Sequence, residues 1–190
     1  ERAQARFAFQ FVAANSPFCS TPGSGDSFFL RDRVCMEAEA SEVSFEPDGV
    51  FLVKDSDSDK ALLLFLEVDR GTESLTDPAG GPNTILHKIR VYRAYMAAGG
   101  YQRYGSLWKT AFRGFRLLLV AHSAARLSSL CRLVESMRPR SDFVWLTESG
   151  LLASRGVCGR VWFAGGQRSR AAESLLGPFV FDAPMTDLTP

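Results

Sequence analysis

The stretch FEPDGVFLV at residues 45–53, followed by ALLLFLEVD at residues 61–69, decides the fold that we expect for this chain. Each is an apolar run of strand length, and the polar residues between them predict a hairpin turn. Asp48 opens the first run, and Glu67 and Asp69 close the second. Neighbouring strands arranged in this way would bring the three carboxylates together at one edge of a sheet. Carboxylates repel one another, so such a cluster is typical of a site for a divalent cation.

Each strand has a local feature that affects its acidic residues. The first, expected over residues 43–54, contains Pro47, which cannot donate a hydrogen bond to a neighbouring strand. The group Pro-Asp-Gly therefore predicts a bulge or bend that can turn Asp48 out of the pleat. The second strand is nearly all apolar, as expected of a strand buried on both faces. Glu67 and Asp69 are two residues apart, so their side chains point to the same face.

The remaining periodicity predicts an α/β sandwich with a mixed central sheet flanked by helices. We expect helices at residues 2–14, 84–98 and after Ser123, a short helix from residue 147, and further strands at residues 27–36, 116–121, 143–146 and 157–164. Thr84 or Asn83 and Ser123 are expected helix caps, and Gly99 is an expected helix stop.

Length and composition predict a single globular domain. The chain has 190 residues, of which 46% are hydrophobic and 23% charged. No run approaches the ~18 to 20 apolar residues of a membrane span, and no secretory signal is visible. We therefore expect a cytoplasmic protein with no membrane partner. The four cysteines form no C-x-x-C pair, so we expect free thiols rather than a zinc site. The chain begins at Glu1 without a methionine, as a fragment or a processed form would.

Charge is unevenly distributed along the chain. Residues 1–80 hold 15 acidic and 7 basic residues, whereas residues 81–190 hold 6 acidic and 15 basic residues. An acidic half that carries the carboxylates and a basic half would suit a metal-dependent enzyme that acts on a polyanion. The alternative is that charge simply varies along the sequence. The two interpretations have equal weight, because halves of a sequence need not be halves in space.

The acidic residues also match a known pattern. Pro47-Asp48, followed by the triplet that runs from Glu67 to Asp69, resembles the PD-(D/E)XK nuclease superfamily. In that superfamily the two acids bind Mg²⁺, and the third residue of the triplet, usually lysine, assists the attacking water. Hydrolysis of a phosphodiester needs this chemistry, because a metal polarises the phosphoryl oxygen and lowers the pKa of a bound water.

A narrower resemblance covers about residues 2–155. The block EVDRGTES at residues 67–74, the helix with Lys88, Tyr92 and Tyr95, the run FRLLLV at residues 115–120, and Arg126-Leu127 with Leu130 are similar to the replication-relaxation family. These are bacterial proteins, largely of plasmids and mobile elements, tied to the control of DNA replication. The resemblance implies a restriction-endonuclease-like three-layer sandwich, with residues 156–190 as a C-terminal extension of a single domain 1–190. Family members often carry an upstream winged-helix DNA-binding domain, which is not among these 190 residues, as expected of a fragment.

The resemblance implies a catalytic site made of Asp48, Glu67, Asp69 and Lys88. The three acids would be ligands of Mg²⁺ or Mn²⁺. One departure matters: Asp69 stands where the triplet usually has lysine, and it cannot place a positive charge beside the metal. Two explanations stay open. Lys88, on the following helix, replaces that lysine; or Asp69 is a third metal ligand or marks a site that is no longer catalytic.

The same resemblance makes DNA the expected partner, together with replication proteins. It implies DNA contacts for three residues, namely Arg70, Thr72 and Tyr92. Each has a purely structural alternative: Arg70 and Thr72 would stabilise their loop, and Tyr92 would belong to the core. Asp48 as a turn residue and Lys88 as a solvated helix residue are the corresponding alternatives in the catalytic set.

Two functions follow from these observations. The first is a Mg²⁺-dependent DNA phosphodiesterase, a nuclease or nickase that works in plasmid or mobile-element replication. The second is a catalytically degenerate nuclease-like module that serves as a DNA-binding or protein-interaction regulator of replication. The Asp69 substitution favours the second function, and the length of the match at residues 67–74 argues against a chance acidic cluster.

Overall fold

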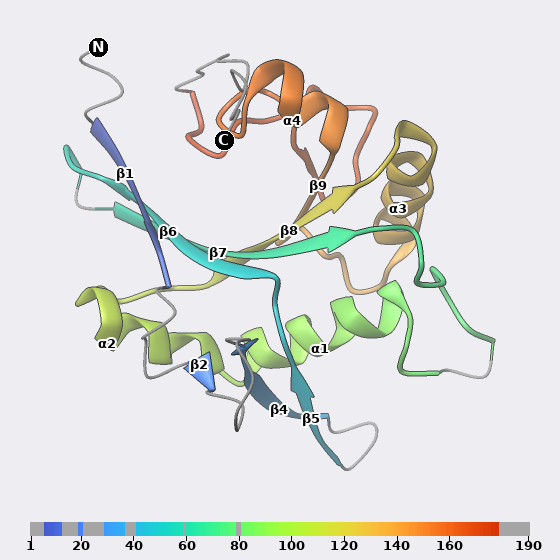
Figure 1. Cartoon of the computed structure of the whole chain (residues 1–190), viewed down its shortest axis with the longest axis horizontal. Coiled ribbons are helices and arrows are strands. Elements are labelled where there is room, and N and C mark those ends of the chain that lie inside the picture. Colours follow the sequence, from blue (N-terminus) through green and yellow to red (C-terminus); the bar gives the residue numbers. More distant parts are fainter. Residues whose placement is uncertain are drawn as a thin grey trace. The chain divides into compact units, whose positions relative to one another are not determined.

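The computed structural model describes residues 6–12, 19–20, 29–36, 41–58, 60–78 and 81–178 (Figure 1). The chain forms two compact units. The first comprises Glu1–Glu67 and Ile89–Leu117, and the second comprises Val68–Lys88 and Leu118–Pro190. Three elements contribute residues to both units, namely β7 (Lys60–Asp69), α1 (Ile85–Ala97) and β8 (Phe115–Ala121). Among the described residues, no helix combines the length and the apolar character needed to cross a membrane.

The first unit is built on a sheet with the strand order β1-β6-β7-β8. β1 (Phe7–Phe11) pairs antiparallel with β6 (Gly49–Asp55), and β6 pairs antiparallel with β7. The register places Val50 opposite Phe65. Two small antiparallel pairs also belong to this unit: β2 (Cys19–Ser20) with β3 (Phe29–Leu30), and β4 (Asp32–Met36) with β5 (Ser41–Phe45).

Aromatic side chains fill the core of the first unit around Phe65 of β7. Phe65 is fully buried, and four rings lie with their centroids 4.6–6.0 Å from its own: Tyr92 and Tyr95 of α1, Tyr104 of α2 (Tyr104–Trp108), and Phe115 of β8. The short helix η2 (Gly100–Arg103) joins α1 to α2. Edge-to-face packing of this kind adds to the free energy gained from burying apolar area.

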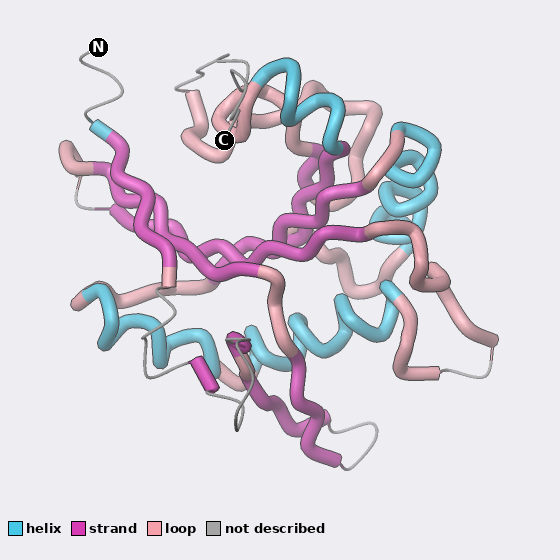
Figure 2. Tube along the Cα trace, viewed as in Figure 1, coloured by secondary structure: helices cyan, strands magenta, loops and turns pink. Residues whose placement is uncertain are grey.

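The second unit has the strand order β7-β8-β9-β10, with β9 (Val144–Glu148) and β10 (Phe163–Ala164) antiparallel. Helix α3 (Ala124–Ser136) lies between β8 and β9 in the chain, and α4 (Ser149–Arg155) follows β9, as the alternating colours of Figure 2 show. The Ser123 side chain accepts a hydrogen bond from the Arg126 amide, which caps α3.

Several sequence predictions are confirmed. The protein is a mixed α/β structure with a central mixed sheet and helices. The strand at β7, the helices α1 and α3, and the strands β8 and β9 lie where periodicity placed them, within a residue or two. Thr84 Oγ1 accepts a hydrogen bond from the His87 amide at 3.1 Å, and Gly99 ends α1 in the left-handed conformation with φ 71°.

The helix expected over residues 2–14 is wrong where the structure can test it. Residues 7–11 form β1, which pairs with β6 from Phe7↔Asp55 to Phe11↔Phe51. The three phenylalanines of this segment alternate along the chain, which is the strand period as well as part of a helical stripe. Pairing with β6 decides between the two. Residues 1–5 and 13–18 lie outside the described part of the chain.

The first central strand is interrupted, and two other expected strands differ in the described residues, which do not include residues 27–28. β5 ends at Phe45 and β6 begins at Gly49, so Pro47 and Asp48 lie in a bend rather than in a bulged strand. The strand expected at residues 27–36 is divided into β3 and β4, and the strand at residues 157–164 is reduced to β10.

The Phe65 cluster makes a direct prediction for stability. Replacing Phe65 with alanine removes the ring that the other four contact, and we expect the free energy of unfolding to fall by about 3–5 kcal/mol. Val68→Ala, on the same strand but at a position that is 47% exposed, should cost less than about 0.5 kcal/mol. Urea unfolding followed by circular dichroism measures both. Equal costs would contradict the central place of Phe65.

Candidate functional site

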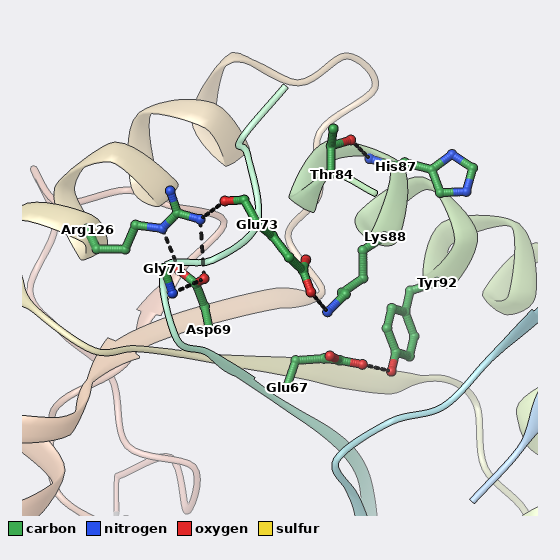
Figure 3. A network of polar contacts seen from close by, with 9 residues as sticks. All are labelled: Glu67, Asp69, Gly71, Glu73, Thr84, His87, Lys88, Tyr92 and Arg126. Carbon is green, nitrogen blue, oxygen red and sulfur yellow. Dashed lines mark hydrogen bonds and ion pairs between the residues drawn. The ribbon is translucent and has the colours of Figure 1, made fainter. Parts of the chain in front are cut away.

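Glu67 is buried in the first unit and is held by a tyrosine. It lies at the end of the apolar run of β7, and only 4% of its surface is exposed. The Tyr92 hydroxyl donates a hydrogen bond of 2.6 Å to Glu67 Oε1 (Figure 3). Burial, with a further contribution from the Glu67 carboxylate, raises the pKa of Tyr92 well above its ordinary value. The phenol therefore stays protonated and remains a donor, which orients the carboxylate.

The register of β6 and β7 brings Asp48 to the level of Glu67. The last pair of the ladder is Gly49 with Leu66, so Asp48 and Glu67 are the two residues immediately beyond it. Asp48 lies in the bend before β6 and is exposed, whereas Pro47 is buried. A buried carboxylate and an exposed one thus lie at matching positions where the β6-β7 ladder ends.

Asp69 belongs to the second unit, where Arg126 of α3 binds it through two nitrogens. Arg126 Nε donates to Asp69 Oδ2 at 2.6 Å, and its Nη2 donates to Oδ1 at 3.2 Å. The Gly71 amide donates a third hydrogen bond to Oδ1 at 2.9 Å. The Asp69 side chain is only 1% exposed. Burial acts to raise the pKa of Asp69, but the Arg126 and Gly71 hydrogen bonds outweigh it, and the net shift is downward.

Arg126 also fixes the segment that follows β7. Its Nη2 donates to the main-chain oxygen of Glu73 at 2.6 Å, and the Glu73 carboxylate pairs with Lys88 Nζ at 3.0 Å. At Gly71, whose φ is 80°, a Cβ atom would collide with the His122 ring. One guanidinium therefore ties the strand end to the loop, and the loop is tied to the start of α1 (Figure 3).

The predicted residues are divided between the two units. Glu67, Tyr92 and Asp48 belong to the first unit, and the second contains the other four: Asp69, Arg70, Thr72 and Lys88. Arg70 and Thr72 are exposed. Tyr92 is fully buried, so it contacts Glu67 and the core in this structure rather than the surface. Within the described residues, no group of three or more His, Cys, Asp or Glu side chains is arranged to hold a metal ion.

The parts that Arg126 and Glu73 play in this network are not predictable from local sequence patterns. Arg126 is 57 residues from Asp69, and nothing local in the sequence links the two. The available signal was that an acid at the end of a buried strand needs a cationic partner, and the chain has many arginines to offer.

The Asp69–Arg126 pair predicts a pH-dependent loss of stability. Asp69→Asn leaves the guanidinium without its counter-charge, and we expect the free energy of unfolding to fall by about 3 kcal/mol at pH 7. The folded pKa of Asp69 lies below the unfolded value of about 3.9. The pair's contribution is therefore complete above that value and is lost as the pH falls through the folded pKa.

Urea unfolding of wild type and D69N from pH 7 to pH 3 measures this effect, with D142N as the control. Asp142 pairs with Arg140 on the exposed surface, so its removal should cost less than about 1 kcal/mol. The difference between wild type and D69N should shrink below about pH 4. A difference in the free energy of unfolding that stays constant across the pH range would show that the charge of Asp69 does not stabilise the fold.

Comparison with known proteins assigns the chain to a family. No curated protein and no solved structure matches it. The sequence profile of the replication-relaxation family matches residues 9–109, which is more than half of the chain and includes β6, β7 and α1. The segment with Asp48, Glu67 and Asp69 lies within the match, whereas Arg126 lies beyond it. The chain belongs to the replication-relaxation family.

Proposed function

We propose that this protein acts on DNA in the replication of a plasmid or mobile element, through a metal-dependent phosphodiesterase-like site at Asp48 and Glu67. The observation that carries the proposal is the pair of acids where the β6-β7 ladder ends: Glu67 is buried and oriented by Tyr92, and Asp48 is exposed at the matching position. A buried acid costs free energy, so a buried carboxylate that is held in one orientation is a feature of functional sites. The family's connection with replication supports DNA as the substrate.

The two acids suit Mg²⁺ or Mn²⁺ by their chemistry. Mg²⁺ takes oxygen ligands, and proteins commonly supply only one or two carboxylates, with waters and substrate phosphate completing the shell. A two-carboxylate site is therefore compatible with the lack of a larger ligand group among the described residues. When bound, the metal would polarise a phosphoryl oxygen and lower the pKa of a water. The chain's own part is to hold Glu67 still, through the Tyr92 hydroxyl, and to present Asp48 to solvent.

The second unit offers groups for DNA rather than further ligands. Arg70 and Thr72 are exposed in the segment that Arg126 anchors, and we propose that they contact phosphate oxygens. Lys88 pairs with Glu73, and its use in place of the missing triplet lysine stays a prediction. Asp69 serves by holding the segment, because its carboxylate is bound by Arg126.

A second function is favoured by one specific observation. The position that usually carries the superfamily's lysine holds Asp69, and this residue is locked in a buried ion pair with Arg126. A site so altered would keep the fold and lose the chemistry. The protein would then bind DNA or a replication protein as a regulator, without cutting.

Cleavage of supercoiled and linear DNA with Mg²⁺ or Mn²⁺ tests the first function. We expect wild type to nick or cut, and D48N and E67Q to lose at least about 100-fold in rate, since each loses a negatively charged ligand. D57N is the matched control: Asp57 is an acid in the turn between β6 and β7, and its side chain is 65% exposed. Its rate should equal that of wild type. Cleavage that persists in both D48N and E67Q would contradict the assignment of Asp48 and Glu67 as the metal site.

Calorimetric titration with Mg²⁺ and Mn²⁺ separates the two functions without DNA. Binding that is lost in D48N and kept in D57N supports the phosphodiesterase-like site. If folded wild-type protein binds DNA but binds neither Mg²⁺ nor Mn²⁺, the regulatory module remains as the function.

A further inference from the structure

The second unit contains a polar cavity that lies entirely outside the segment matched by the family. Its volume is about 350 Å³, and it is lined by the end of α3, residues 138–142 and the loop 165–170. A smaller cavity of about 180 Å³ shares Arg140, Gln167 and Arg170 with it. We call the two together the arginine cavity. None of its residues belongs to the site of Asp48 and Glu67.

Close packing fixes the loop that forms one wall of the arginine cavity. Gly165 and Gly166 adopt φ values of 59° and 75°, which side chains rarely allow. A Cβ atom at Gly166 would collide with the Cys131 carbonyl oxygen of α3, and one at Gly165 would lie 2.9 Å from the Asp142 carboxylate. The Gly165 amide also donates to the Val144 carbonyl at 2.8 Å. The loop is therefore held against α3 and β9, and the cavity is built into the fold.

The arginines of the cavity are only partly neutralised. Arg140 pairs with Asp142 at 2.9 Å. Arg138 instead donates to the main-chain oxygens of Glu135 and Met137, at 3.0 and 2.8 Å, which are uncharged acceptors. Within the part of the chain that the structure describes, Arg138 and Arg170 make no ion pair with a carboxylate. Glu135 and Glu173 also line the arginine cavity, and among the described residues neither pairs with its arginines.

We propose that the arginine cavity binds the phosphodiester backbone of DNA. The planar guanidinium presents a fork of donors that fits two phosphate oxygens, and Gln167 and Ser169 add neutral donors in the same lining. Two adjoining cavities that share Arg170 would accept neighbouring phosphates of one strand, whereas a free phosphate needs only one. The choice of DNA among phosphorylated ligands rests on the proposed function. The contacts carry no base information, so binding here is independent of sequence.

The test is fluorescence anisotropy with a short labelled DNA duplex, in EDTA, over a range of NaCl concentrations. R138Q/R170Q removes the two arginines that lack a carboxylate partner. We expect its affinity to fall at least about tenfold, and the slope of log K against log salt to decrease by about 2, since two phosphate contacts are lost. R155Q/R160Q is the matched control: both arginines are exposed, lie in the same unit and line neither cavity. It removes the same charge and should keep the wild-type slope.

The outcomes are distinct. Equal losses in the two double variants would show a general effect of charge and would overturn the proposal. Wild type that binds inorganic phosphate in the cavity but no DNA would overturn it too. If R138Q/R170Q proves unfolded by circular dichroism, the wild-type protein provides the test: the amide NMR signals of residues 138, 140–142 and 165–170 should shift on adding duplex. Shifts confined to other residues would refute the cavity.

Failure here is separable from failure of the catalytic proposal. If wild type cuts no DNA while R138Q/R170Q still loses affinity in EDTA, the metal site falls and the cavity proposal stands. If R138Q/R170Q binds as wild type does, the cavity proposal falls while the cleavage assay with D48N and E67Q still tests the metal site independently.

Discussion

Burial of β7 on both faces is the constraint on which the rest of the structure depends. Leu63, Leu64 and Phe65 are completely inaccessible to solvent, and the Phe65 ring sits among four others. A slip of one residue would exchange the two faces of the strand and break this packing, so the register with β6 is fixed. That register decides where Glu67 and Asp48 lie. The chemistry proposed for this protein is thus positioned by hydrophobic packing, and the polar contacts of Tyr92 only refine it.

Elements that depend on local interactions were predictable from the sequence, whereas elements that depend on contacts between distant parts of the chain were not. β7, α1 and α3 were predictable because their periodicity and caps are local: an apolar run, Thr84 and Gly99, and Ser123. Residues 7–11 were not, because three alternating phenylalanines fit both periods and only pairing with β6 settles them. The first central strand failed for a similar reason. Its first residues, up to Phe45, pair with β4, a partner that no local pattern specifies.

The candidate site divides in the same way. The acids at positions 48, 67 and 69 could be named from their spacing, and the family match includes all three. Their partners could not, because Tyr92 reaches Glu67 across 25 positions and Arg126 reaches Asp69 across 57. Those partners change the interpretation of each acid. Glu67 accepts a hydrogen bond from a neutral donor, whereas Asp69 is paired with a guanidinium. Two acids that share a strand face in the sequence therefore have different electrostatic roles.

The Asp69–Arg126 pair has a consequence for how this end of β7 responds to its surroundings. Arg126 is a covalently attached counter-ion, and it occupies the place beside Asp69 that a dissolved cation would otherwise take. Its effective concentration is set by the fold and does not fall on dilution or dialysis. The segment from Gly71 to Glu73, which the same guanidinium holds, should therefore keep its conformation when every free metal ion is chelated. The loop is preorganised by the protein's own charge, so the conformation of Arg70 and Thr72 is independent of metal supply.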